Sequence, residues 1–398
     1  MNVPAARRDL VVLYVAMFVS RLAFGIIIII FPLYIVHASD LATAAALALY
    51  PAFEAAFSYP MGRVCDTRGR KVVFVSALGY MAVLMSCIGL TRNIYAVASI
   101  HAAMGVGAAG VTISSLAMIT DLTGERNRGA GMGAFDFANI GGYAFGILMG
   151  GRLDAAFPDR LGLSFFVTGL TVAASFVLAI LVLKEPLHEA GERQFLTSPL
   201  RSLDPESRAL LPIWLGITTL IGVVFFLPRA LATLGFTGST TANLLFVGVT
   251  AIGLGSIGFG ALSDSVGREK VMILGVVGLG GLLLSVGASF AEGIKDVTRN
   301  FPVIGIFAIL TSALVPTILA KVGDRADKKS VGAAMGVYGI LLSAGTAAGT
   351  LIAGFAHQAG GISGIFLAGG ILFAGAAGIS LVLWLRIDRS TTNSRDGT

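Results

Sequence analysis

Long apolar runs separated by short polar loops dominate the chain. Each run holds roughly 20 or more mostly apolar residues, and a helix of that length crosses the hydrocarbon core of a bilayer. Backbone polar groups in lipid must be paired within their own segment, so we expect each run to be a helix. The predicted helices lie near 10–37, 42–62, 70–91, 94–119, 129–153, 162–184, 209–234, 240–262, 269–291, 299–321, 330–356 and 361–386.

Basic residues collect on one side of this predicted arrangement. Lys and Arg favour cytoplasmic loops, so the richer side is predicted to face the cytoplasm. That side holds Arg7, Arg8, Arg63, Arg68, Arg70, Lys71, Arg126, Arg128, Lys184, Arg193, Arg201, Arg208, Arg268, Lys270, Lys321, Arg325, Lys328, Lys329, Arg386, Arg389 and Arg395. The other side has only Arg92, Arg152, Arg160, Lys295 and Arg299, with Arg229 near a helix end. Both termini are therefore predicted to be cytoplasmic, which requires an even number of spans.

The longest polar segment, 185–208, follows the sixth predicted helix and has the composition of a linker. The Gly-x-x-x-Asp-x-x-Gly-Arg pattern around Asp66 recurs around Asp264, 198 residues later and about half a chain length away. These features predict an all-α membrane protein of twelve helices in two pseudo-symmetric halves, 1–184 and 209–398. Such repeats form a bundle with a cavity between the halves.

Composition narrows the functional class. Hydrophobic residues make up 56% of the chain and charged residues 13%, too few to cover a water-soluble surface. The net charge of +6 comes from basic residues dispersed in loops, without the basic face of a nucleic-acid-binding protein. No phosphate-binding loop or cluster with metal-ligand spacing is present in the sequence. We therefore expect no enzyme activity, no cofactor and no metal, and a lipid bilayer as the surroundings.

The repeated loop resembles the signature loop of the major facilitator superfamily, Gly-x-x-x-Asp-x-x-Gly-Arg-Arg/Lys. The first copy matches at Gly62, Asp66, Gly69, Arg70 and Lys71, and the second at Gly260, Asp264, Gly267 and Arg268, where Glu269 interrupts the basic pair. Together with the span count, the resemblance covers essentially the whole chain. It implies a secondary transporter that works as a monomer by alternating access, with a small-molecule substrate.

These loop residues are predicted to form a cytoplasmic latch. The two glycines of each copy allow close approach and a turn, and Asp66 can face the positive end of a neighbouring helix. In the family that neighbour is the eleventh span, which begins here near Ser330. Arg70 can hold Asp66 or a nearby carbonyl. The alternative is that these charges only fix topology.

The fifth predicted helix carries a glycine series that resembles the antiporter motif of drug:proton exporters, Gly-x8-Gly-x3-Gly-Pro-x2-Gly-Gly. The series comprises Gly133, Gly142, Gly146, Gly150 and Gly151, and Ile147 stands at the proline position. The alternative is ordinary small-residue packing between helices.

The fourth predicted helix contains His101, Gly105 and Gly107, where proton-coupled branches of the family show Arg-x-x-x-Gly-x-Gly. A histidine at the arginine position titrates in the physiological range. His101 is therefore a candidate proton carrier or a neutral hydrogen-bond donor to substrate. The alternative is a hydrogen-bonded packing histidine.

Ionisable residues inside spans are costly and face a cavity or a partner. Arg21 and Glu54 lie near mid-depth of the first two helices, and Asp136 lies at similar height in the fifth, with Asn139 one turn on. Glu54 and Asp136 are two possible counter-ions for Arg21. This cluster is a candidate proton site, and the alternative is a static buried ion pair.

Arg229 follows Pro228 near the outer end of the seventh predicted helix. The C-terminal spans offer it no obvious acidic partner. Arg229 is therefore a candidate contact for an anionic substrate, or it extends to the outer surface.

The leading hypothesis is a proton-coupled exporter of a small amphipathic compound in the plasma membrane. Its central site would draw on spans one, two, four, five and seven. The alternatives are an uptake or exchange carrier for an organic anion, bound by Arg21 and Arg229, and a membrane sensor or scaffold that transports nothing.

Overall fold

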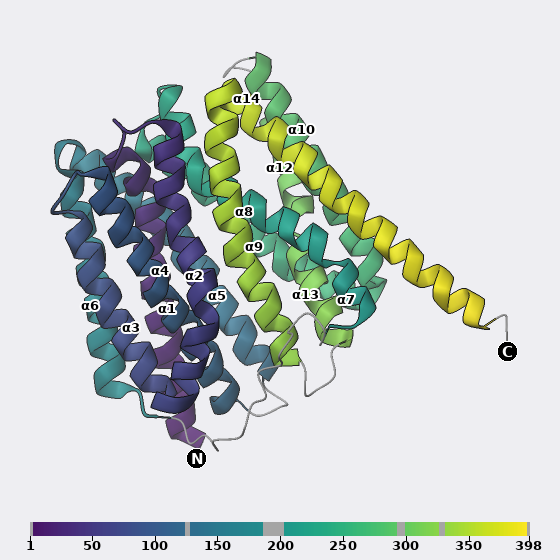
Figure 1. Ribbon diagram of the computed structural model, residues 1–398, viewed down its shortest axis with the longest axis horizontal. Helices are drawn as coiled ribbons and strands as arrows, with labels where there is room; N and C mark the ends of the chain where they lie inside the picture. Colours follow the sequence, from purple (N-terminus) through teal and green to yellow (C-terminus); the bar gives the residue numbers. More distant parts are fainter. Residues whose placement is uncertain (1–2, 124–127, 186–202, 293–298, 326–330, 396–398) are drawn as a thin grey trace. The chain divides into compact units, whose positions relative to one another are not determined.

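The structure is a computed structural model that describes residues 3–123, 128–185, 203–292, 299–325 and 331–395. Within these ranges the regular secondary structure is helical and includes no strand (Figure 1). The first helices are α1 (Val3–Tyr34), α2 (Asp40–Arg68), α3 (Arg70–Ile88), α4 (Ile94–Leu122), α5 (Arg128–Ala156), the 3-10 helix η1 (Pro158–Arg160) and α6 (Leu161–Val182). They are followed by α7 (Pro205–Ala209), α8 (Leu211–Thr233), α9 (Gly238–Val266), α10 (Arg268–Glu292), α12 (Phe301–Thr311), α13 (Leu314–Arg325) and α14 (Val331–Arg395).

Ten segments of the described residues are long and apolar enough to cross a membrane. One of them, Val337–Ile387, has 51 residues and is too long for a single span. Non-helical backbone at Gly360 and Gly361 breaks α14 there, with a φ of 61° at Gly361 that favours glycine. Figure 1 accordingly shows α14 as two arms joined by a sharp turn. With both arms of α14, the 29-residue α5, and α12 and α13 counted together as the one segment Phe301–Val322, the described chain contains twelve segments of spanning length, which agrees with the predicted fold class.

Large apolar side chains lie on the surfaces of these helices. Leu170, Leu181 and Leu284 are 73%, 77% and 74% exposed. In water such a surface would aggregate, whereas lipid tails solvate it. The chain is therefore a multi-pass membrane protein.

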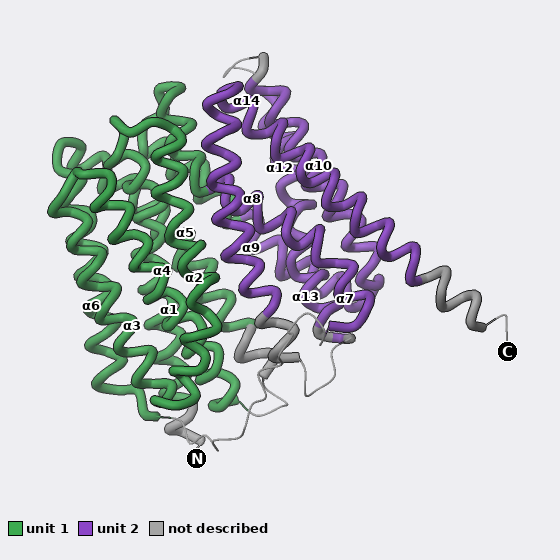
Figure 2. Tube along the Cα trace, in the orientation of Figure 1, with its two compact units in different colours: residues 1–192, 225–250 green, residues 193–224, 251–398 purple. Residues whose placement is uncertain are grey.

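The chain divides into two compact units, which Figure 2 shows in different colours. One comprises residues 1–192 and 225–250, and the other comprises residues 193–224 and 251–398. Helix α8 therefore passes into the first unit at Phe225, and α9 returns to the second at Ala251. The units group residues by contact in one conformation, whereas the predicted halves follow the internal repeat. The halves 1–184 and 209–398, joined by 185–208, stay a prediction.

Glycine allows α1 and α5 to pack backbone to backbone in the first unit. A Cβ added at Gly142 would lie 2.5 Å from the Phe18 carbonyl oxygen, and one at Gly146 would lie 2.8 Å from the Gly25 Cα. One added at Gly150 would lie 3.0 Å from the carbonyl oxygen of Ile26. The four-residue spacing of these glycines places them on one face of α5. This close contact brings polar side chains of α5 against Arg21.

Helices α2 and α4 approach through Gly105. A Cβ there would lie 2.9 Å from the Cβ of Phe53 and 3.0 Å from the backbone nitrogen of Glu54, and it would collide with the Tyr50 carbonyl oxygen. This crossing places Tyr50 and Glu54, one helical turn apart on α2, beside α4. These contacts position the polar groups at the centre of the first unit.

Candidate functional site

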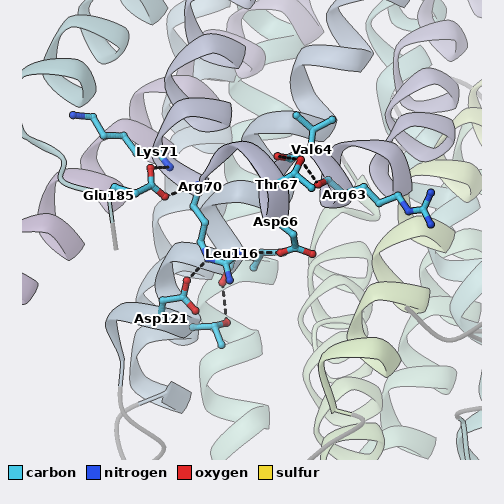
Figure 3. Close-up of polar contacts among 10 residues, drawn as sticks. Arg63, Val64, Asp66, Thr67, Arg70, Lys71, Leu116, Asp121 and Glu185 are labelled. Atoms are coloured by element: carbon cyan, nitrogen blue, oxygen red, sulfur yellow. Dashed lines mark hydrogen bonds and ion pairs between the residues drawn. The ribbon is translucent and has the colours of Figure 1, made fainter. Parts of the chain in front are cut away.

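The first signature loop forms a compact ion-pair cluster (Figure 3). The Arg70 side chain is 2% exposed, and its Nη1 lies 3.2 Å from Asp66 Oδ1. Its Nε donates to a carboxylate oxygen of Asp121, near the end of α4. Arg70 therefore joins α2, α3 and α4 through two carboxylates, in the arrangement that suits a planar guanidinium.

The Glu185 carboxylate caps the start of α3. It accepts hydrogen bonds from the backbone nitrogens of Arg70, at 2.6 Å, and Lys71, at 3.0 Å. An anion is stabilised there by the unpaired N–H groups and the helix dipole. Gly69 has a φ of 99°, in the left-handed region that favours glycine, and a Cβ on it would lie 3.0 Å from this carboxylate. The sequence placed Glu185 in the linker without a partner, so this contact was missed.

The second signature loop repeats the cluster with different partners. Arg268 Nη1 lies 2.5 Å from Asp264, and its Nε lies 3.1 Å from Asp324 at the end of α13. Gly267 has a φ of 106°, close to that of Gly69. Asp324 therefore binds the Nε of Arg268 as Asp121 binds the Nε of Arg70.

Glu269, which interrupts the basic pair of the second copy, has a partner of its own. Its carboxylate lies 2.8 Å from Nζ of Lys321, a side chain that is 8% exposed. Lys321 Nζ also lies 3.7 Å from the Glu206 carboxylate on α7. Glu269 stands where the signature has a basic residue, and its carboxylate neutralises the buried Lys321.

Sequence reasoning missed Asp121 and Asp324. The available signal was that each aspartate ends a long apolar run, 51 residues after Arg70 and 56 after Arg268. The predicted contact of Asp66 with the helix start near Ser330 lies outside the described residues. The latch itself stays a prediction, because a single arrangement of charges does not show movement.

The outer glycines of the α5 series differ from the three that contact α1. Gly151 packs on the start of α9, where an added Cβ would lie 3.0 Å from the Ser239 Cα. Among the described residues, no atom lies within 4 Å of a Cβ added at Gly133. The contacts of Gly142, Gly146 and Gly150 are those of small-residue packing, the alternative interpretation of the series.

Arg21 is the centre of a buried polar network. The residue is 8% exposed. Its Nε donates to Asn139 at 2.7 Å, its Nη1 to Tyr143 at 3.1 Å and its Nη2 to Thr112 at 3.1 Å. The Thr112 hydroxyl in turn donates to Glu54 Oε1 at 3.2 Å. Thr112 therefore bridges the guanidinium and the carboxylate that the sequence proposed as its counter-ion.

Asp136, one of the two possible counter-ions for Arg21, does not contact it in this arrangement. Asp136 is exposed, and its side chain has no hydrogen bond or ion pair within the described part of the chain. One face of α5 carries Asp136, Asn139 and Tyr143. Arg21 donates hydrogen bonds to Asn139 and Tyr143, which lie one helical turn apart. Asp136 lies a further turn towards the start of α5, where its carboxylate does not reach the guanidinium.

His101 is buried at 3% exposure between two aromatic rings. Its ring centroid lies 4.4 Å from that of Phe31 and 5.2 Å from that of Tyr50. Its Nδ1 lies 2.9 Å from the carbonyl oxygen of Ala46, an acceptor that requires the proton on Nδ1. These contacts are those of a packing histidine, and a proton-carrying role stays a prediction.

A small, partly open cavity of about 20 Å³ lies beside His101 in the first unit. Its walls come from α1, α2, α4, α5 and α8, which are the predicted spans one, two, four, five and seven. The lining is mostly apolar or aromatic and comprises Phe24, Ile27, Ile28, Leu47, Tyr50, His101, Tyr143 and Phe225. Tyr143 connects this cavity to the Arg21 network.

Arg229 has an acidic partner that the sequence did not reveal. Its Nε lies 3.0 Å from Asp40 at the start of α2, and its other two nitrogens donate to the carbonyl oxygens of Val36 and Ala38. Asp40 begins α2, and Val36 and Ala38 lie in the loop before it, all far from Arg229 in sequence. The side chain neither extends freely to the surface nor offers its three nitrogens to an anion in this arrangement.

The family model described as Major Facilitator Superfamily matches residues 13–252 and 213–398. The chain belongs to this superfamily, and it is a transporter rather than an enzyme.

Named relatives and solved structures agree with this assignment. The chain is 26% identical over 287 residues to "Multidrug resistance protein MdtG" of Dickeya zeae (strain Ech586), covering 67% of this chain and 69% of that one. It is 28% identical over 345 residues to "Uncharacterized MFS-type transporter YuxJ" of Bacillus subtilis (strain 168), covering 82% and 84%. An inward-facing bacterial homologue of the human lysosomal transporter Spinster superposes with a TM-score of 0.77 at 14% identity, covering 96% and 97%. At this identity the structure supports the fold alone.

Proposed function

We propose that the chain is a proton-coupled exporter of small amphipathic compounds in the plasma membrane. It works as a monomer by alternating access, with halves 1–184 and 209–398 moving about a central site. The lining beside His101 carries this proposal, because it is drawn from five spans and is mostly aromatic and aliphatic. Its cavity of about 20 Å³ is water-sized in this arrangement, so binding of a substrate requires the space to widen as the halves move. Such walls suit a lipophilic compound, and few polar groups are needed to orient it.

The polar network next to the cavity supports proton coupling. Glu54 reaches Arg21 through Thr112, and Arg21 reaches the cavity wall through Tyr143. Gain or loss of a proton at Glu54 changes the charge that balances Arg21 in a site of low dielectric constant. Asp136, exposed one turn from Asn139, is the second candidate proton carrier.

Relatives at 26% identity carry the name "Multidrug resistance protein MdtG", which is consistent with export of lipophilic compounds. The organic-anion alternative loses support, because Arg229 is bound to Asp40 and two carbonyl oxygens. Membership of the superfamily removes the sensor or scaffold alternative.

The test uses purified protein in liposomes that contain a pH-sensitive dye. We expect addition of a lipophilic cation such as ethyltriphenylphosphonium to drive proton movement through the wild-type protein. Glu54→Gln should abolish that movement, whereas Asp159→Asn, an exposed residue of η1 outside this network, should not. Proton movement driven by organic anions alone would overturn the proposal in favour of the anion carrier.

A further inference from the structure

Basic side chains gather at the end of α6 in the first unit. Arg8 Nη2 on α1 donates to the Val182 carbonyl oxygen at 3.5 Å, and Lys71 Nζ on α3 donates to the Ile180 carbonyl oxygen at 3.2 Å. Lys184, which is exposed, follows two residues after the helix. Cations at this position compensate the unpaired carbonyl groups and the negative end of the helix dipole. The three positive charges therefore lie around the end of a single helix, whose diameter is roughly 10–12 Å.

These cations keep hydrogen-bonding capacity after their contacts within the protein. The Arg8 side chain is 49% exposed, and its Nε and Nη2 bind Asp9, whereas its Nη1 donates to no group in the described part of the chain. Neither Lys71 nor Lys184 has a carboxylate partner among the described residues. The two nearby carboxylates are engaged, because Asp9 is buried against Arg8 and Glu185 accepts from the start of α3.

Figure 3 shows that the Lys71 side chain extends away from the Glu185 carboxylate. The ammonium group is therefore not neutralised by the acid that binds the backbone nitrogen of the same residue. The end of α6 presents free N–H donors and an excess of positive charge, which together suit an anionic group such as a phosphate.

An exposed apolar surface continues from these cations along α1 and α6, which pack against each other. Val11 and Val15 follow Arg8 at the spacing of one face of α1. Val177 and Leu181, one turn apart, are exposed on α6. Hydrocarbon chains solvate such a surface in a bilayer. A molecule that matches both features has fatty acyl chains and a negatively charged headgroup.

We propose that an anionic phospholipid binds at the end of α6, with its phosphate on Arg8, Lys71 and Lys184 and its acyl chains along the exposed faces of α1 and α6. Basic residues next to a membrane span attract anionic headgroups, and pockets between spans hold them in place. The lipid phosphate then lies beside the first signature loop, to which Lys71 belongs. Binding of this lipid does not depend on the proposed export activity.

The experiment is a native mass spectrometry titration of purified protein in detergent. The probes are phosphatidylglycerol and phosphatidylcholine with the same acyl chains, and we expect the wild-type protein to prefer the anionic lipid. Each basic residue near a membrane surface contributes about 5-fold to that preference. Arg8→Gln combined with Lys184→Gln should therefore weaken phosphatidylglycerol binding by about 25-fold and leave phosphatidylcholine binding unchanged.

The matched control removes the same charge from two exposed positions of α2, by Arg63→Gln combined with Arg68→Gln. This variant should keep the wild-type preference. Lys184→Gln alone removes a side chain that makes no hydrogen bond within the described residues, so it tests the site without disturbing packing, and about a 5-fold loss is expected. Arg8→Lys, which keeps the charge, should retain most of the preference.

Inorganic phosphate is the competitor that separates a lipid site from a site for free anions. Millimolar phosphate should not displace phosphatidylglycerol, because the acyl chains contribute to binding. Displacement would overturn the proposal in favour of a soluble-anion site. Equal binding of the two lipids by the wild-type protein, or an equal loss of preference in the α2 control, would also overturn it. The cations would then only orient the chain in the membrane and compensate the end of α6.

Discussion

At the residue scale, Thr112 and Arg70 each connect charges that the sequence places far apart. Thr112 on α4 accepts from Arg21 on α1 and donates to Glu54 on α2. Arg70 binds Asp66 four residues away and Asp121 on another helix. Neither arrangement is a simple ion pair of one acid and one base, so substitutions that keep charge and size test the geometry directly.

Thr112→Val removes the bridging hydroxyl and keeps the shape of the side chain. The lost hydrogen bonds of charged groups cost about 1.5–3 kcal/mol, which corresponds to roughly 10- to 150-fold in a coupled equilibrium. We expect probe-driven proton movement in liposomes to fall by about that factor. Thr171→Val on α6 is the control, since Thr171 donates only to the Val167 carbonyl oxygen of its own helix. Equal activity of the two variants would show that Thr112 is not part of the coupling network.

Arg70→Lys keeps the positive charge but offers one ammonium group in place of a planar fork. A lysine does not reproduce the two separate contacts with Asp66 and Asp121. We expect a loss of about 1–3 kcal/mol in stability, measured by thermal denaturation in detergent, and slower transport. Arg68→Lys, two residues earlier and exposed, should match the wild-type protein. A transport rate unchanged in Arg70→Lys would contradict the latch and favour a role in topology alone.

At the element scale, helix contacts in the first unit depend on small residues and on the ends of helices. Gly142, Gly146 and Gly150 allow α5 to lie against the backbone of α1. At the end of α8, Arg229 holds the loop that precedes α2. Both contacts join segments more than a hundred residues apart.

Gly146→Ala places a methyl group against the backbone of Leu22 and Gly25, which has no flexible side chain to move. Such overpacking costs about 1–3 kcal/mol. We expect a lower melting temperature in detergent. Gly133→Ala on the same helix meets no atom within 4 Å, so its stability should be unchanged or slightly higher. Equal destabilisation of the two variants would mean that the α1–α5 contact is looser than the structure shows.

Arg229→Ala removes one ion pair and two hydrogen bonds to backbone carbonyls, whereas Asp40→Asn removes only the charge of one partner. We expect the arginine variant to lower the melting temperature more than the aspartate variant. The double variant should resemble Arg229→Ala alone, because the two residues share one interaction. Arg160→Ala, an exposed residue of η1, is the control. Additive effects would argue against the contact.

At the scale of the whole molecule, orientation in the membrane follows from the charge of the loops. The basic residues predict that the loop between α2 and α3 faces the cytoplasm and that η1 faces outward. The two clusters around Arg70 and Arg268 would then lie on the cytoplasmic side. Orientation is a property of the inserted chain and requires a measurement in membranes.

A cysteine at Asp159 in η1 should react with a membrane-impermeant maleimide in intact cells. A cysteine at Arg68 should react only in inside-out vesicles. Both positions are exposed, and both variants are built with Cys65 and Cys87, the two native cysteines, replaced by alanine. The opposite labelling pattern would invert the predicted topology.

The sequence alone determined the helices, their number and the family. Apolar runs of spanning length and the twofold signature loop are local patterns, and the bilayer requires each run to satisfy its own backbone. The same patterns indicated that Arg21, Glu54 and His101 lie within the membrane spans and face a cavity or a partner, because ionisable groups are costly in lipid.

The tertiary structure decided the partners of these residues. Asn139 rather than Asp136 binds Arg21, since helix packing sets which turn of α5 lies opposite α1. Asp121, Asp324, Glu185 and Asp40 became visible as partners only in three dimensions. Such contacts depend on the rotation and height of one helix against another. The backbone approach of glycines and the packing of side chains fix these quantities, and neither can be read from the spacing of residues along a single chain.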